Sequence, residues 1–87
     1  MNNNVENSIT NLRLQRMYEE KTFFVQELGK LLALADSSIA YAQYEHTDDG
    51  YEWVHIYNTD GYRIAKINVH MDSHSAILKD VIKNLDL

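Results

Sequence analysis

The stretches HTDDGYE at residues 46–52 and YNTDGYR at residues 57–63 are near copies of one turn motif, and they decide the fold. Each contains Thr or Asn, then any residue, then Asp-Gly-Tyr. This order fits a type I turn whose Gly adopts the left-handed conformation and closes a hairpin with a G1 bulge. Because such turns join antiparallel neighbours, we predict three antiparallel strands at residues 39–46, 51–58 and 62–70.

Helices are predicted before and after these strands. Between residues 8 and 35, apolar side chains recur at spacings of three and four, as on one face of a helix. Asn7 or Ser8 is a suitable N-cap for this helix. The same spacing recurs between residues 73 and 85. The predicted fold is therefore α+β, with the order α-β-β-β-α and a three-stranded antiparallel sheet.

The chain has 87 residues, so we expect a single domain at residues 1–87.

The first predicted helix is longer than the strands. A helix of 28 residues is about 42 Å long, whereas a strand of seven residues spans only about 23 Å. Either the first helix overhangs the sheet or it breaks, most plausibly at residues 19–22. An overhang would expose Leu12, Leu14 and Met17, and a core this small gains stability by self-association. We expect a homodimer.

The acidic side chains are concentrated in the middle of the chain. The net charge is −5, and residues 31–62 contain six acids and no Lys or Arg. A field of one sign repels nucleic acid and membrane surfaces and attracts basic partners. We therefore expect neither direct nucleic-acid binding nor membrane binding, although an ordinary acidic surface would have the same composition.

Residues His70, Asp72 and His74 place three metal-ligand types at alternate positions. Their position between a strand and a helix has a simpler explanation, because Asp72 or Ser73 can cap the first turn of that helix. A zinc site would also need ligands from the strands. We expect capping, and neither a metal site nor a cofactor.

Other chemical motifs are weak. Glu45 and Glu52 could form a catalytic pair of carboxylates across the first hairpin, but carboxylates on exposed hairpins are usually solvated. The chain has no cysteine and its N-terminus has no apolar segment of the signal-peptide kind, which favours the cytoplasm. We expect no catalytic residues and no enzymatic activity.

The strands are rich in aromatic side chains. Val54 and Ile56 alternate with Trp53, His55 and Tyr57, so neither face of this strand is polar. If both helices cover one face, the other presents aromatic rings to solvent, and Tyr and Trp are common interface anchors. Alternatively, each helix covers one face. The expected partner-binding residues are Glu45, Asp48, Asp49, Tyr51, Glu52, Trp53 and Tyr57.

The register of the second hairpin is open. If Asn58 pairs with Tyr62, Trp53 shares a face with Ala65 and Ile67. A slip of one residue reverses that arrangement.

The stretch YEWVHIYNTDGYRIAKINVHMDSHSAILKDVIKNL at residues 51–85 resembles small acidic proteins of bacterial phages and conjugative elements. The shared features are a strand with an aromatic residue after Glu, a Gly turn, the INV segment, an Asp-Ser helix start and an apolar helix. Some such proteins are anti-CRISPR inhibitors. The motif is structural, and the resemblance assigns no catalytic or binding residue.

Two hypotheses follow. The first is an inhibitor that occupies the basic nucleic-acid-binding surface of a partner, such as a CRISPR nuclease in the bacterial cytoplasm, with its acidic and aromatic hairpin. The second is a small homodimeric regulatory or accessory protein that contacts another protein through an aromatic sheet face.

Overall fold

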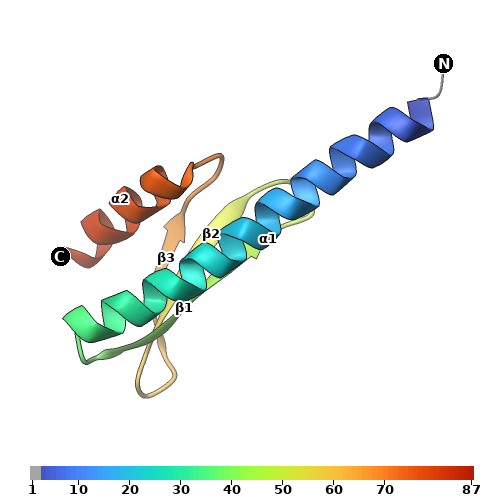
Figure 1. Ribbon diagram of the computed structural model, residues 1–87. Helices are drawn as coiled ribbons and strands as arrows, with labels where there is room; N and C mark the ends of the chain where they lie inside the picture. Colours follow the sequence, from blue (N-terminus) through green and yellow to red (C-terminus); the bar gives the residue numbers. More distant parts are fainter. Residues whose placement is uncertain (1–2) are drawn as a thin grey trace.

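The computed structural model describes residues 3–87, with side chains from residue 7 onward, and has the predicted α+β architecture. The elements follow one another as α1 (Asn3–Ala35), β1 (Ile39–His46), β2 (Glu52–Asn58), β3 (Arg63–Asn68) and α2 (His74–Leu85) (Figure 1). The strands form an antiparallel sheet in the order β1-β2-β3. The order α-β-β-β-α is confirmed.

Both turns have the predicted geometry. The amide of Gly61 donates to the carbonyl of Asn58 at 3.0 Å, and the amide of Gly50 donates to the carbonyl of Thr47 at 3.0 Å. Both glycines have positive φ, at 87° and 92°. The side chain of Asn58 also accepts from the amide of Tyr62 at 2.9 Å, which fixes the second turn. These contacts lie within five residues, which is why the sequence predicts them.

Helix α1 is continuous, so of the two predicted alternatives the overhang is confirmed and the break at residues 19–22 is wrong. It spans 33 residues and extends beyond the sheet at its N-terminal end, which gives the molecule a length of 55 Å against a width of 23 Å (Figure 1). Asn7 and Ser8 lie inside the helix and do not cap it. Its end is confirmed, because Asp36 leaves the helix and its side chain accepts from the amide of Ser38 at 2.9 Å.

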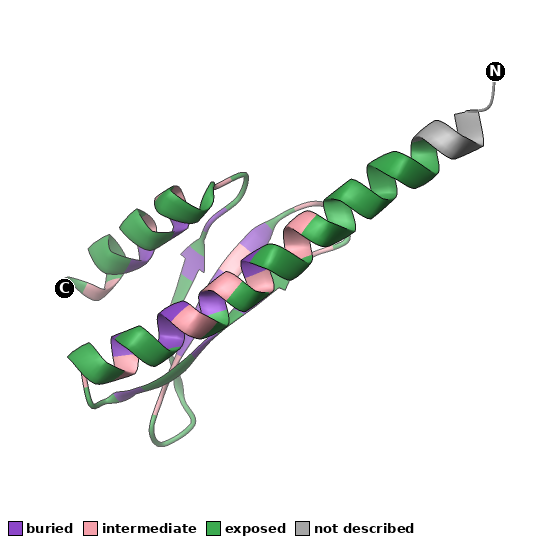
Figure 2. Cartoon of the chain, viewed as in Figure 1, coloured by how far each residue is buried: buried purple, intermediate pink, exposed green. Residues whose placement is uncertain are grey.

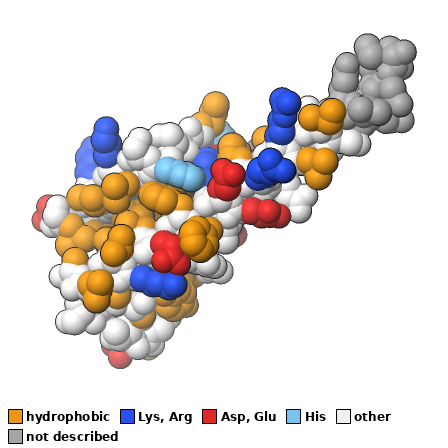
Figure 3. Space-filling view, in the orientation of Figure 1, with side chains coloured by type: hydrophobic (Ala, Val, Ile, Leu, Met, Phe, Trp, Pro, Cys, Tyr) orange, Lys and Arg blue, Asp and Glu red, His pale blue; other side chains and the backbone are white. Residues whose placement is uncertain are grey.

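The two helices cover the same face of the sheet, so the alternative with one helix on each face is wrong. The core between helices and sheet includes Val25 and Leu28 of α1, Val54 and Ile56 of β2, and Ile77 of α2 (Figure 2). Apolar side chains also remain exposed on the helical side, which Figure 3 shows. The other face of the sheet is covered by no element between residues 3 and 87.

The structure decides the register of the second hairpin, which the sequence left open, in favour of the slipped alternative. The amide of Asn58 does donate to the carbonyl of Tyr62, at 2.8 Å. A bulge then shifts the pairing, so that Tyr57 lies opposite Arg63 but Ile56 lies opposite Ala65. Trp53 therefore does not share a face with Ala65 and Ile67. The extra residue of the bulge reverses the two faces for the remainder of β3.

Within the described residues, none of the helices combines the length and the apolar character that crossing a bilayer requires.

Candidate functional site

The uncovered face of the sheet, called here the open face, gathers eight side chains from three strands. The antiparallel register places Tyr41 opposite Tyr57, while Gln43 lies opposite His55 and His55 opposite Lys66. Because side chains alternate along a strand, these residues point to the side away from the helices. The open face consists of Tyr41, Gln43, Glu45, Trp53, His55, Tyr57, Arg63 and Lys66.

Aromatic rings on the open face are held by contacts across the strands. The rings of Tyr41 and Tyr57 stack with their centroids 4.7 Å apart and their planes 15° apart. The Lys66 ammonium group lies 4.4 Å from the centre of the Trp53 ring, within range of a cation–π interaction. Tyr41 is nevertheless 50% exposed. These rings are ordered by their neighbours and still accessible to a partner.

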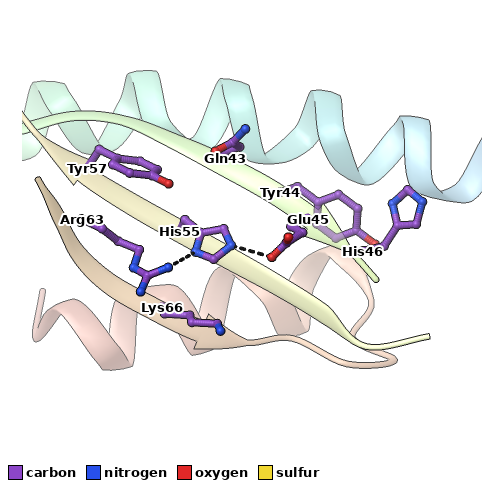
Figure 4. Close-up of a pocket in the computed structure, with 8 residues that line it drawn as sticks. All are labelled: Gln43, Tyr44, Glu45, His46, His55, Tyr57, Arg63 and Lys66. Carbon is purple, nitrogen blue, oxygen red and sulfur yellow. Dashed lines mark hydrogen bonds and ion pairs between the residues drawn. The ribbon is translucent and has the colours of Figure 1, made fainter. Parts of the chain in front are cut away.

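A polar chain crosses the middle of the open face. His55 is buried within the sheet, where its Nε2 lies 2.9 Å from Glu45 Oε1 and its Nδ1 lies 3.4 Å from Arg63 Nη1 (Figure 4). A guanidinium group can only donate hydrogen bonds, so His55 Nδ1 accepts one from Arg63. His55 Nε2 then donates a hydrogen bond to Glu45 Oε1. The hydrogen bond from His55 lowers the pKa of Glu45. This chain holds the His55 ring between the Glu45 carboxylate and the Arg63 guanidinium group.

A hollow of about 590 Å³ lies beside this chain, lined by the side chains drawn in Figure 4. Its lining contains the carboxylate of Glu45 and the cationic groups of Arg63 and Lys66. The open face is therefore of mixed charge, and it is aromatic as predicted. It contains no Ser or Thr hydroxyl group for His55 to activate.

The acidic residues of the first hairpin separate into two environments. Asp48 and Asp49 are exposed at the turn, and a hydrogen bond from Thr47 lowers the pKa of Asp49. Tyr51 is 48% exposed, and its ring lies 5.0 Å from that of His70. Glu52 does not join this group, because its side chain points to the helical side and is buried.

Glu52 is the centre of a buried polar network that the sequence analysis missed. Its Oε1 accepts from Lys21 Nζ at 2.5 Å and from the Tyr44 hydroxyl at 2.6 Å. Its Oε2 accepts from the amide of Met71 at 2.7 Å. Burial alone would raise the pKa of Glu52, but the hydrogen bonds and the Lys21 charge outweigh it, so this pKa is lowered. One carboxylate thus connects α1, β1, β2 and the β3–α2 connection.

The carboxylates of Glu45 and Glu52 cannot act as a pair. Glu45 lies opposite Trp53 and belongs to the open face, whereas Glu52 lies opposite His46 and points into the core. Burial beside Glu52 raises the pKa of the Tyr44 hydroxyl, so this hydroxyl stays protonated and donates its hydrogen bond to Glu52. The role of Glu52 in this network is structural.

The segment from His70 to His74 contains a helix cap. Ser73 is the N-cap of α2, and its hydroxyl accepts from the amide of Ala76 at 3.2 Å. Capping is confirmed for Ser73, and Asp72 does not take that role. The ring of His74 instead stacks on Phe24 of α1, with centroids 4.6 Å apart. Among the described residues no group of three His, Asp or Glu side chains is placed to hold a metal ion.

Asp72 makes stability depend on pH. Its Oδ2 is buried without a hydrogen-bond partner among the described residues, and burial raises its pKa to about 6, with the Asp80 carboxyl group adding to the effect. The folded state therefore holds this proton more strongly than the unfolded state, whose pKa is 3.8. This contribution to stability is fully present below pH 3.8 and is lost as the pH rises towards 6.

We expect the melting temperature of Asp72→Asn minus that of the parent to increase as the pH rises from about 4 to about 7. The measurement is a pair of thermal melts at each pH, followed by circular dichroism. Parallel pH profiles for parent and variant would contradict this assignment.

Comparisons with known proteins found no similar protein. No protein-family model matches the chain, and searches of curated proteins and of solved structures found no match.

Proposed function

We propose that this protein is a non-enzymatic protein-binding module that docks on a partner protein through its open face. The observation that carries the proposal is the exposed aromatic surface around Tyr41, Tyr57 and Trp53, which no element of the described chain covers. Rigid Tyr and Trp rings supply contact area at a small cost in conformational entropy. This is the accessory-protein hypothesis from the sequence.

The charges on the open face define the chemistry of the partner. Arg63 and Lys66 carry exposed cationic groups on β3, and Glu45 carries an exposed carboxylate on β1. A complementary partner surface presents an apolar or aromatic centre with an acidic group on the β3 side. Charge pairs at the rim of such a surface contribute more to orientation and to association rate than to affinity.

The acidic turn supports a second candidate, the inhibitor that mimics nucleic acid on a basic partner surface in the bacterial cytoplasm. Asp48 and Asp49 are exposed, and no Lys or Arg occurs between residues 31 and 62. Two observations favour the first candidate over this one. Glu52 is buried and paired, and the open face beside the turn carries Arg63 and Lys66.

One capture experiment separates the two candidates. The immobilised protein is incubated with a bacterial lysate, and the retained proteins are quantified for the parent and for two double variants. Docking through the open face predicts that Tyr41→Ala/Lys66→Glu lowers retention of the specific partner about tenfold or more. It also predicts that Asp48→Lys/Asp49→Lys retains that partner as the parent does.

Lys79→Glu is the matched control, because Lys79 is exposed on α2, away from the sheet. All variants should have the circular dichroism spectrum of the parent, since each altered side chain is exposed. The reverse pattern, with binding lost only in Asp48→Lys/Asp49→Lys, would replace the first candidate by the nucleic-acid mimic. Glu52 is left unchanged, because reversing it would place two cations together in the core.

A further inference from the structure

The outward side of α1 carries apolar side chains that nothing in the described chain covers. Ile9 is 45% exposed, Leu12 is 65% exposed and Phe23 is 64% exposed. They lie on the side of the helix opposite Val25 and Leu28, which pack on the sheet. The N-terminal part of α1 extends beyond the sheet (Figure 1).

These residues belong to one continuous stripe. Ile9, Leu12, Arg16, Glu19 and Phe23 follow one another at alternating spacings of three and four. This is the heptad pattern of a helix that packs against another helix. The centre of the stripe is charged, with Arg16 and Glu19, and its ends are apolar. Any partner helix must therefore offer a negative charge, a positive charge and two apolar groups in matching positions.

The surface area indicates how large the missing contact is. The accessible surface is 6207 Å², whereas a folded monomer of 10.2 kDa usually exposes about 5300 Å². The excess is about 900 Å², close to the roughly 800 Å² that each partner buries in a standard interface. The excess surface of this elongated molecule is therefore enough to form one protein–protein interface of standard size.

We propose that a second copy of this chain covers the stripe, with the two α1 helices antiparallel. In one register, Leu12 lies opposite Phe23 of the second copy and Arg16 lies opposite Glu19 of the second copy. Two-fold symmetry repeats each pair, so the interface has two apolar pairs and two ion pairs.

Other arrangements of the same two helices are unfavourable. A parallel pair in register places Arg16 against Arg16 and Glu19 against Glu19, which repel. Moving the antiparallel register by one heptad places Leu12 against Arg16 and Ile9 against Glu19. Of these arrangements, only the proposed register matches apolar with apolar and positive with negative from Leu12 to Phe23, and it places Ile9 opposite Gln26 at the edge of the contact.

The surface of α1 also has a place for the incoming side chain. Leu12, Gln15, Arg16 and Glu19 line a groove of about 230 Å³. Their spacing is that of the four residues that receive a knob in knobs-into-holes packing. The proposed register brings Glu19 of the second copy to this groove, beside Arg16. The sheet lies on the other side of α1, so the open face stays accessible in the dimer.

Charge reversal tests the proposal by light scattering on the full chain at about 100 µM. The parent should be a dimer of twice 10.2 kDa. Arg16→Glu alone and Glu19→Arg alone each create two like-charged contacts, and each should weaken self-association by about tenfold or more. The double variant Arg16→Glu/Glu19→Arg should restore the dimer, because it exchanges the two members of each pair. Lys79→Glu is the control and should remain dimeric.

The orientation is tested by disulfide trapping, for which the cysteine-free parent gives a clean background. A mixture of Leu12→Cys and Phe23→Cys chains should cross-link faster than either variant alone, since the register joins position 12 to position 23 of the other copy. A parent that is monomeric at this concentration would overturn the proposal, and a dimer unaffected by both single reversals would do the same. Faster cross-linking of each variant with itself would indicate parallel helices and would also overturn it.

Discussion

Replacing Lys21 by Met is expected to lower the free energy of unfolding by about 3–5 kcal/mol, the usual cost of breaking a buried ion pair. Lys21 is 4% exposed and Glu52 is 3% exposed, so the carboxylate that remains has little access to water. Met preserves most of the volume of Lys, which limits the effect of packing. Chemical unfolding in urea, followed by circular dichroism, gives the free energy directly.

A double-mutant cycle separates the ion pair from the rest of the network. Glu52→Gln removes the charge and keeps an oxygen for the Tyr44 hydroxyl or the Met71 amide. The double variant Lys21→Met/Glu52→Gln should therefore lose less stability than the two single losses added together, by about 1–3 kcal/mol. Additive losses would show that the two side chains do not act as a pair.

The pH dependence of Lys21→Met provides an independent check. In the parent, the lowered pKa of Glu52 means that its contribution is present above pH 4.5 and is lost as the pH falls through the folded-state value. Without the Lys21 charge, we expect burial to outweigh the remaining hydrogen bonds from Tyr44 and Met71 and to raise the pKa of Glu52. The stability contributed by this residue should then fall as the pH rises above 4.5, which is the opposite slope.

Gly29→Ala is expected to destabilise the protein by about 1–3 kcal/mol, although Ala is normally the better residue in a helix. A methyl group at Gly29 would lie 2.5 Å from the backbone nitrogen of Ala42 and 3.0 Å from its Cβ. Backbone cannot move aside as a flexible side chain can, so α1 must shift away from β1. Urea unfolding of the variant measures the loss.

Two comparisons make this result specific. Gly50→Ala meets nothing within 4 Å, so its cost should be limited to the strain of its positive φ, about 1 kcal/mol. Ala42→Gly added to Gly29→Ala should recover only part of the loss, because the contact with the backbone nitrogen of residue 42 remains. A Gly29→Ala variant as stable as the parent would show that α1 and β1 pack less closely than described.

Local sequence information predicted the fold well because the decisive contacts are local. The turn at Asn58 is made within five residues, and the cap at Ser73 within three. The start of α1 was not predicted, since neither Asn7 nor Ser8 interrupts the helical residues around it.

The contacts that decide the candidate site are long-range, and the sequence predicted them poorly. Glu52 follows the first turn and resembles a solvated hairpin acid, while its partner Lys21 lies 31 residues earlier. One signal was present, because Lys21 interrupts the apolar stripe of the first helix at a core position. A buried Lys needs an acid from another element, and this requirement could have indicated Glu52. The bulge in β3 had no comparable signal, so the faces of that strand could not be assigned.

The sequential packing of the elements has a consequence for how the chain folds. Helix α1 packs on β1, β1 pairs with β2, β2 pairs with β3, and α2 follows on β3, so most spatial neighbours are also neighbours in the chain, and the contact between α1 and α2 is an exception. Such low contact order favours rapid folding, because little loop entropy is lost before each contact forms. The bond between Lys21 and Glu52 is different, since it closes a loop that contains the first hairpin strand and its turn. It can form only after α1 and the hairpin have docked, so it should contribute to the slowness of unfolding rather than to the speed of folding.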